Sequence, residues 1–171
     1  DMSSPPYPAV AVANFFIDTA VEDPDVGPVT QLKLQKLVYI AHGWHLAIYD
    51  EHLIKEPVEA WEFGPVVRDL YSRAGDYGSD PISDRLDGTS SRSAPELLEI
   101  PSSDERTRNF LRSVWQTYRE YSAVELTSIT HKEDTPWYET WEREGGKENK
   151  TDPIPSDTIK DHYKRLWDEQ S

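Results

Sequence analysis

The sequence predicts a mainly α protein: a single compact helical domain of about six to seven helices around a central helix at residues 30–49, with a short β-hairpin near residues 53–63. Three observations predict this class. Apolar residues recur at helical spacing in several segments, helix-start residues precede most of them, and the spacing changes to strand-like alternation at one place. A length of 171 residues fits one domain that buries its own core.

The N-terminal part of the chain contains the first predicted helix. Residues 1–8 are rich in proline and serine, and we expect them to be extended or disordered. Apolar residues on one face predict a helix over residues 8–21, with Pro8 at its start. The sequence EDPDVGP at residues 22–28 then ends the helix.

The next helix is predicted to be the centre of the domain. Thr30 is a suitable N-cap, and the helix runs to about Tyr49. At about 100° per residue the helix carries two apolar stripes on nearly opposite sides. A helix with two such stripes is covered by other elements on both sides. The main stripe consists of Leu34, Leu37, Val38, Ala41, Trp44, His45 and Ile48, and the second of Leu32, Tyr39 and Leu46.

Two histidines of this helix, His42 and His45, are three residues apart in the sequence HGWH. His45 lies near the middle of the main stripe beside Trp44, and we interpret it as a buried structural histidine. His42 lies at the edge of the stripe. Gly43 faces the other side, where its missing side chain allows a close backbone approach. The alternative is a metal site, which needs a third ligand from elsewhere. The pair also lacks the central Glu and the i, i+4 spacing of the zinc protease motif.

A strand-like alternation follows in PVEAWEFGPVV, which begins at Pro57. Residues 53–56 are the hairpin partner that we expect. Gly64 ends the strand, and Pro65 is expected at the first position of a helix that continues to residue 74. Residues 75–102 show no regular pattern. Such a long irregular segment is either a tolerated insertion or a functional loop.

The second half of the chain is predicted to be helical with clear start signals. The apolar spacing predicts a helix over residues 103–119. Ser122 and Glu125 have the spacing of a capping box, which predicts a helix from Ala123 to about His131.

A further helix is predicted to start at Thr135, with Pro136 in its first turn. The polar sequence EGGKENKTDPIP is predicted to be a loop. Ser156 is the expected cap of the last helix.

The composition restricts the classes of partner. With 32 acidic and 18 basic residues the formal net charge is −14. This charge repels nucleic-acid phosphates and anionic membrane surfaces, so we expect neither as a partner. It attracts a cationic protein. No segment approaches the about 20 apolar residues that span a bilayer. The chain has no cysteine, which fits the reducing cytoplasm.

The sequence shows no catalytic or cofactor-binding motif. Neither a glycine-rich phosphate loop nor a G-x-S-x-G nucleophile motif occurs. Glu56, Glu59 and Glu62 alternate faces on a strand, so they do not form a carboxylate cluster. His131 and Asp134 could form a base and its orienting carboxylate, but no nucleophile accompanies them at the spacing of a known catalytic motif. We therefore expect no enzyme activity, no metal and no cofactor.

Three motifs in a fixed order resemble one known family. They are K-L-x-x-I-A-H-G-W-H-L at residues 36–46, E-A-W-x-F-G-P-V at residues 59–66, and T-H-x-x-x-x-P-W at residues 130–137. Together they resemble the Panacea domain, also known as the SocA-like antitoxin or phage-associated protein family. The resemblance covers nearly the whole chain, and we expect the domain to span residues 9–170.

The resemblance implies a mainly helical, cytoplasmic antitoxin of a bacterial toxin-antitoxin system that neutralises a cognate toxin by direct binding. One alternative is a proteolytic adaptor that delivers the toxin to the ClpXP protease. A second alternative, from a different class, is a metal-dependent hydrolase that uses His42 and His45. The resemblance does not identify the toxin.

Aromatic residues near element ends are the candidates for contact with the toxin, because aromatic side chains dominate protein interfaces. These candidates are Trp61, Phe63, Tyr77, Trp137 and Trp141. Trp137 and Trp141 are four residues apart, and we expect at least one of them to be exposed. Other motif residues are expected to hold the fold. They are Trp44, His45, Gly64, Pro65, His131 and Pro136.

Overall fold

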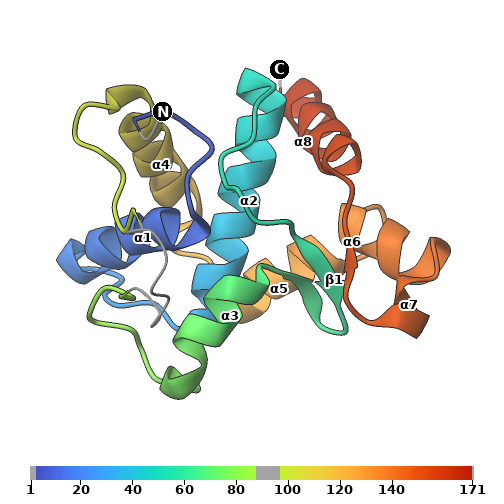
Figure 1. The fold of residues 1–171 in the computed structure, drawn as a ribbon, viewed down its shortest axis with the longest axis horizontal. Coiled ribbons are helices and arrows are strands. Elements are labelled where there is room, and N and C mark those ends of the chain that lie inside the picture. Colours follow the sequence, from blue (N-terminus) through green and yellow to red (C-terminus); the bar gives the residue numbers. More distant parts are fainter. Residues whose placement is uncertain (1–2, 88–96, 171) are drawn as a thin grey trace.

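Helices form most of the computed structural model, which describes residues 3–87 and 97–170 (Figure 1). The predicted mainly α class with a short hairpin is confirmed. The longer helices are α1 (Ala9–Glu22), α2 (Gln31–Tyr49), α3 (Arg68–Ala74), α4 (Glu105–Tyr118), α5 (Ala123–His131) and α8 (Ser156–Gln170). Single turns form α6 (Pro136–Tyr138) and α7 (Gly146–Asn149), and the strands are β1 (Glu59–Trp61), β2 (Gly64–Val66) and β3 (Asp152–Pro153). No described helix combines the length and the apolar character needed to cross a membrane.

Helix α2 is the central helix, as the two apolar stripes predict. Helices α1, α4, α5 and α8 all pack against it (Figure 1). The Thr30 side chain accepts a hydrogen bond from the Lys33 amide at 3.4 Å, so the predicted N-cap is confirmed. Every residue from Lys33 to Leu46 is buried, including the polar ones. Only the ends of the stripes emerge, with Leu32 42% and Ile48 44% exposed.

Gly43 allows Tyr163 of α8 to pack closely on α2. A Cβ at this position would lie 2.2 Å from the Tyr163 ring on α8. The Tyr163 ring also packs edge-on against Trp44, with centroids 5.1 Å apart. The predicted role of this glycine in close packing is confirmed, and the last helix thereby becomes part of the core around α2.

The described residues before α1 form turns and bends, and the end of this segment is anchored. Residues 1 and 2 lie outside the described part of the chain. Tyr7 is buried and forms a parallel bridge with Ile54. Its amide donates to the Leu53 carbonyl at 2.8 Å, and its hydroxyl donates to Asp104. The N-terminal segment therefore covers the turn that follows α2.

The hairpin differs from the prediction in its second strand. β1 pairs with β2 and β3 in an antiparallel sheet of order β2-β1-β3, and Trp61 faces Gly64 across a two-residue turn. The predicted partner, residues 53–56, instead holds Tyr7. Pro65 lies in β2 and does not start a helix, because α3 begins at Arg68. A proline fits here because β2 is an edge strand, where a missing N–H removes no ladder bond.

Part of the long irregular segment is fixed by a single side chain. Asn14 on α1 donates to the carbonyls of Leu86 and Leu98 at 2.9 Å each, and it accepts from the Leu86 amide at 2.7 Å. Ile82 forms a bridge with Val29. Both flanks of residues 88–96, which lie outside the described residues, are thus held against the core.

The helix starts in the second half follow the sequence signals. Asp104 caps α4 by accepting from the Thr107 amide, and the capping box of Ser122 and Glu125 is present in full. The Thr135 hydroxyl accepts from the Tyr138 amide at 3.2 Å. The helix that follows is only one α turn before it widens into a π-helical turn, η2 (Glu139–Arg143). The polar segment predicted as a loop also contains α7 and β3.

Candidate partner-binding site

The two histidines of HGWH fix the turn after α2. His45 is 0% exposed, and its Nδ1 lies 2.7 Å from the Glu51 carbonyl oxygen. A carbonyl only accepts, so Nδ1 carries the hydrogen. The Leu53 amide donates to His42 Nδ1 at 3.4 Å. Burial lowers the pKa of both rings, that of His42 to about 3, so both are neutral at pH 7. The predicted burial of His45 is confirmed, and its contacts are structural.

A metal site on this pair requires a third ligand. Within residues 3–87 and 97–170, no group of three or more His, Cys, Asp or Glu side chains is arranged to hold a metal ion. The ring nearest to His42 is that of His52, with centroids 5.4 Å apart. The hydrolase alternative thus has no three-ligand site in the described part of the chain.

An apolar hollow lies beside the hairpin, with a volume of about 750 Å³. We call it the hairpin groove. It lies between the first turns of α2, the hairpin, α3 and the start of α5. Its apolar lining residues are Leu32, Trp61, Phe63, Val66, Tyr71 and Ala123, and Gln35 and Lys36 of α2 also line it. Phe63 is 71% and Tyr71 51% exposed. Exposed apolar side chains around a hollow are typical of interaction sites.

The end of the hairpin is held on α2 by one amide side chain. Gln35 donates from Nε2 to the Val67 carbonyl at 2.9 Å and accepts from the Val67 amide at 3.0 Å. Both residues are buried, and the Val67 carbonyl also accepts from the Tyr71 amide at 3.2 Å, so Gln35 is the partner on which the buried Val67 N–H depends. This contact fixes the end of the hairpin to α2, and both line the hairpin groove.

A polar cluster fixes the outer face of the hairpin. The Trp61 indole donates to Glu59 at 2.9 Å, and its ring lies 5.0 Å from that of Tyr71. The guanidinium of Arg68 donates to Glu59 at 2.8 Å and lies 5.5 Å from the Trp61 ring. Trp61 is therefore half-buried and held in place, whereas Phe63 at the turn projects from the surface.

The second site expectation, an exposed tryptophan on residues 137–141, is wrong. Trp137 is 5% and Trp141 6% exposed. The two rings stack at 5.6 Å, and the Trp137 indole donates to the Trp61 carbonyl at 2.6 Å. The His131 ring also packs against the Trp137 ring, with centroids 4.5 Å apart. The hairpin covers these side chains, so Trp137 supports the groove from below and offers no surface to a partner.

Tyr77 and the other predicted structural residues take different positions. Tyr77 is half-buried in the turn η1 (Gly75–Tyr77), where it packs against the core and does not line the groove. Gly64 has a φ of +126°, a value that favours glycine. Pro136 is buried at the first position of α6.

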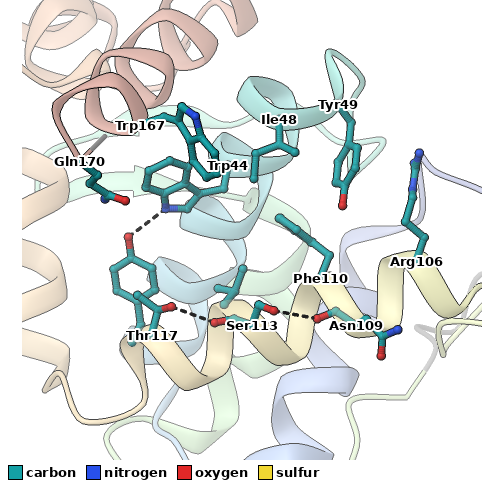
Figure 2. Close-up of a pocket in the computed structure, with 12 residues that line it drawn as sticks. Trp44, Ile48, Tyr49, Arg106, Asn109, Phe110, Ser113, Thr117, Trp167 and Gln170 are labelled. Atoms are coloured by element: carbon teal, nitrogen blue, oxygen red, sulfur yellow. Dashed lines mark hydrogen bonds between the residues drawn. The ribbon is translucent and has the colours of Figure 1, made fainter.

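A second hollow lies at the other end of α2 and is shown in Figure 2. We call it the α4–α8 groove. Its volume is about 520 Å³, and its apolar lining residues are Trp44, Ile48, Phe110, Val114 and Trp167. Trp167 is 54% exposed. In Figure 2 the polar side chains of α4 form a row along one side, opposite the tryptophans.

Three polar side chains of the α4–α8 groove donate hydrogen bonds within the protein. The Trp44 indole donates to the Tyr118 hydroxyl at 2.9 Å. The Thr117 hydroxyl donates to the Ser113 carbonyl at 2.9 Å, and the Ser113 hydroxyl donates to the Asn109 carbonyl at 3.2 Å (Figure 2). The hydrogen-bond donors of the two hydroxyls and the indole are therefore already used within the protein.

Comparison with known proteins identifies the family. The family described as "Antitoxin SocA-like, Panacea domain" matches residues 34–138. The chain belongs to this family. Antitoxin SocA of Caulobacter vibrioides is 33% identical over 129 residues, which cover 75% of this chain and 68% of that protein. No solved structure matches.

The SocA-like motifs meet at the hairpin groove. Lys36 begins the first motif, the second motif is the hairpin itself, and the third supplies His131 and Trp137 beneath it. Helices α1 and α8 lie outside the matched span, yet both pack on α2. Sequence reasoning missed Lys36 and Leu32 as site residues. The available signal was that α2 is covered on both sides, which buries any charged residue between its stripes.

Proposed function

We propose that this chain is a non-enzymatic antitoxin of the cytoplasm that neutralises a protein toxin by binding it directly. Its membership of the SocA-like family supports an antitoxin role. The structural observation that carries the proposal is the hairpin groove, where Phe63 projects with 71% of its surface exposed beside an apolar hollow. Such an aromatic residue is a typical anchor of a protein interface.

The two properties of the surface have separate roles in this proposal. The apolar groove supplies affinity, because the toxin removes apolar surface from water when it covers the groove. The net charge of −14 attracts a cationic toxin and raises the rate of encounter. No covalent step is needed for neutralisation, because occupation of the toxin's active surface is sufficient.

The test is co-expression with the product of the adjacent reading frame in the native genome. We expect the wild-type chain to restore growth and to co-purify with that product. Phe63→Asp should lose both, because a carboxylate at the turn cannot be buried without a partner. Val21→Asp is the matched control, since Val21 is exposed on α1 and away from the groove. If the wild-type chain neither restores growth nor co-purifies, the proposal is wrong.

A proteolytic adaptor is the second candidate function. An adaptor must bind its cargo and the ClpXP protease on separate surfaces. The described part of the chain has two apolar grooves that share no lining residue, and they lie at opposite ends of α2. The α4–α8 groove would then be the surface for the protease.

A reconstituted degradation assay separates the two functions. If the chain is an adaptor, toxin degradation by ClpXP should increase when the chain is added, and Trp167→Ser should abolish the increase while toxin binding persists. If degradation is unchanged by the wild-type chain, the adaptor function is rejected and direct neutralisation remains.

A further inference from the structure

The floor of the hairpin groove holds a lysine with more donors than partners. Lys36 is 1% exposed and lines the groove. Its ammonium has three N–H donors. One of them donates to the Pro65 carbonyl oxygen at 3.1 Å. Among residues 3–87 and 97–170, no carboxylate forms an ion pair with Lys36, although the chain as a whole is strongly acidic.

This charge is not compensated inside the protein. Burial is the cause that lowers the pKa of Lys36 to about 8, and no neighbouring anion raises it again. The side chain is still mainly charged at pH 7. A buried charge without a counter-ion destabilises the folded state. The lysine therefore has a cost in stability, which a purely structural residue would not explain.

The backbone around the ammonium leaves room for it. A Cβ on Gly64 would lie 2.8 Å from Lys36 Nζ, so only glycine permits the observed position. His131 on α5 lies on the other side, and its pKa is lowered by burial and by the charge of Lys36. This neighbour is neutral at pH 7. Glu62 at the hairpin turn also lines the groove, but its side chain is exposed and no ion pair joins it to Lys36 in the described residues.

We infer that the hairpin groove receives an aspartate or glutamate side chain from an otherwise apolar segment of the protein partner, and that the Lys36 ammonium donates to this carboxylate. The inference rests on the proposed function in taking the groove as the partner-binding surface. The apolar lining matches the neighbours of the acidic residue, and the uncompensated ammonium matches its charge.

A side chain fits this groove better than the end of a chain. A backbone segment that enters the groove brings N–H and C=O groups that need partners, and the lining is mainly apolar. An acidic side chain brings one carboxylate on an apolar stem. Elsewhere on this acidic surface a carboxylate is repelled, so the contact with Lys36 also fixes the register of the bound segment.

Three short peptides test the chemistry without knowledge of the partner. The probes are acetyl-Leu-Glu-Leu-amide, its isosteric Gln form, and acetyl-Leu-Gln-Leu with a free C-terminal carboxylate. Binding is followed through the indole N–H resonance of Trp61. We expect saturable binding of the Glu peptide and at least about 10-fold weaker binding of the other two, because a buried charged pair is lost. Equal binding of the Glu and Gln peptides, or no saturable binding, would overturn the inference. Stronger binding of the third peptide would assign the site to a chain end.

Two lysine variants separate a binding role from a structural one. Lys36→Met should abolish the preference for the Glu peptide and raise the melting temperature by about 3 °C or more, since it removes an uncompensated charge. Lys33→Met is the matched control, because Lys33 is also buried on α2 but donates to the Arg119 carbonyl and does not line the groove. It should keep the preference. A lower melting temperature for Lys36→Met together with an unchanged preference would show a structural lysine.

The toxin itself distinguishes this inference from the proposed function. If the toxin binds the wild-type chain and Lys36→Met equally well, the antitoxin role stands and the inference is wrong. If no toxin binds but the Glu peptide does, the antitoxin role is rejected and the ligand chemistry of the groove stands.

Discussion

The two ends of helix α2 form grooves of different chemistry. Leu32 lines the hairpin groove and Ile48 lines the α4–α8 groove, and the 16 helical steps from one to the other separate them by about 24 Å along the helix. Both grooves are apolar and both expose a large aromatic side chain, Phe63 in one and Trp167 in the other.

The grooves differ in what their polar groups already bind. In the α4–α8 groove the Trp44 indole donates to Tyr118, and the Ser113 and Thr117 hydroxyls donate to the backbone of their own helix. In the hairpin groove Lys36 has donors to spare. An apolar hollow thus becomes a selective site only where a buried polar group still lacks a partner.

The largest expected effect is on the backbone of the hairpin. Gly64→Val should lower the free energy of unfolding by about 4 kcal/mol, because a β-branched residue at this positive φ is strained and its Cβ meets the Lys36 ammonium. Gly75→Ala is the control, since a Cβ there meets no atom within 4 Å. Urea unfolding followed by circular dichroism measures both. An equal loss in the two variants would show that the hairpin has no special dependence on glycine.

The next effect concerns the contact that joins hairpin and helix. Gln35→Leu should lower the free energy of unfolding by about 3 kcal/mol, because it leaves the buried N–H of Val67 without a partner and removes one of the two hydrogen bonds to the Val67 carbonyl. Gln35→Glu keeps the acceptor oxygen, and its protonated carboxyl group also has a donor. Below the pKa of the new carboxyl group, this variant should therefore lose less stability than Gln35→Leu. Denaturant unfolding measures the difference. If Gln35→Leu is neutral, the hairpin is held by its apolar contacts alone.

Removal of the Lys36 charge should raise the free energy of unfolding, by an amount that depends on pH. The pKa is lowered from 10.5 to about 8 in the folded state, so the folded chain loses this proton before the unfolded chain does. The wild type should therefore gain stability as the pH rises from 8 to 10.5. At pH 7, the free energy of unfolding of Lys36→Met should exceed that of the wild type by about 3 kcal/mol, and the gap should close near pH 10.5. A gap that is constant with pH would show that the lysine charge carries no penalty.

The smallest effect is expected in the α4–α8 groove. Trp44→Phe removes the indole donor to Tyr118 and should lower the free energy of unfolding by about 1 kcal/mol. Toxin binding should be unchanged if this groove has no part in neutralisation. Thermal unfolding and co-purification measure the two quantities. Loss of toxin binding at wild-type stability would move the binding site to this end of α2.

Local signals in the sequence predicted most of the helices. Thr30, Ser122 and Thr135 each cap a helix as expected, because a cap bonds to a backbone amide within three residues. The two stripes predicted the central helix, because the spacing of apolar residues determines which faces are covered.

Long-range contacts explain what the sequence did not reveal. The hairpin turn at residues 62–63 lacks the usual Asn-Gly signal, so the sequence around Pro65 is typical of a helix start although it forms a strand. Trp137 and Trp141 have the spacing of one helix face, but the hairpin that buries them lies about 75 positions away in the chain. The number of Lys36 N–H donors that remain without a partner depends on the carbonyls near its ammonium, and only the folded chain determines which carbonyls these are.

The measurement that tests the account most directly is the affinity of the toxin for two matched variants, Phe63→Ser and Trp167→Ser, by isothermal titration calorimetry. Both truncate an exposed aromatic residue, one in each groove. The account predicts that Phe63→Ser weakens binding by about 2 kcal/mol or more, roughly 30-fold, and that Trp167→Ser leaves it within about twofold of the wild type. The reverse result, with Phe63→Ser unchanged and Trp167→Ser weakened, would contradict it.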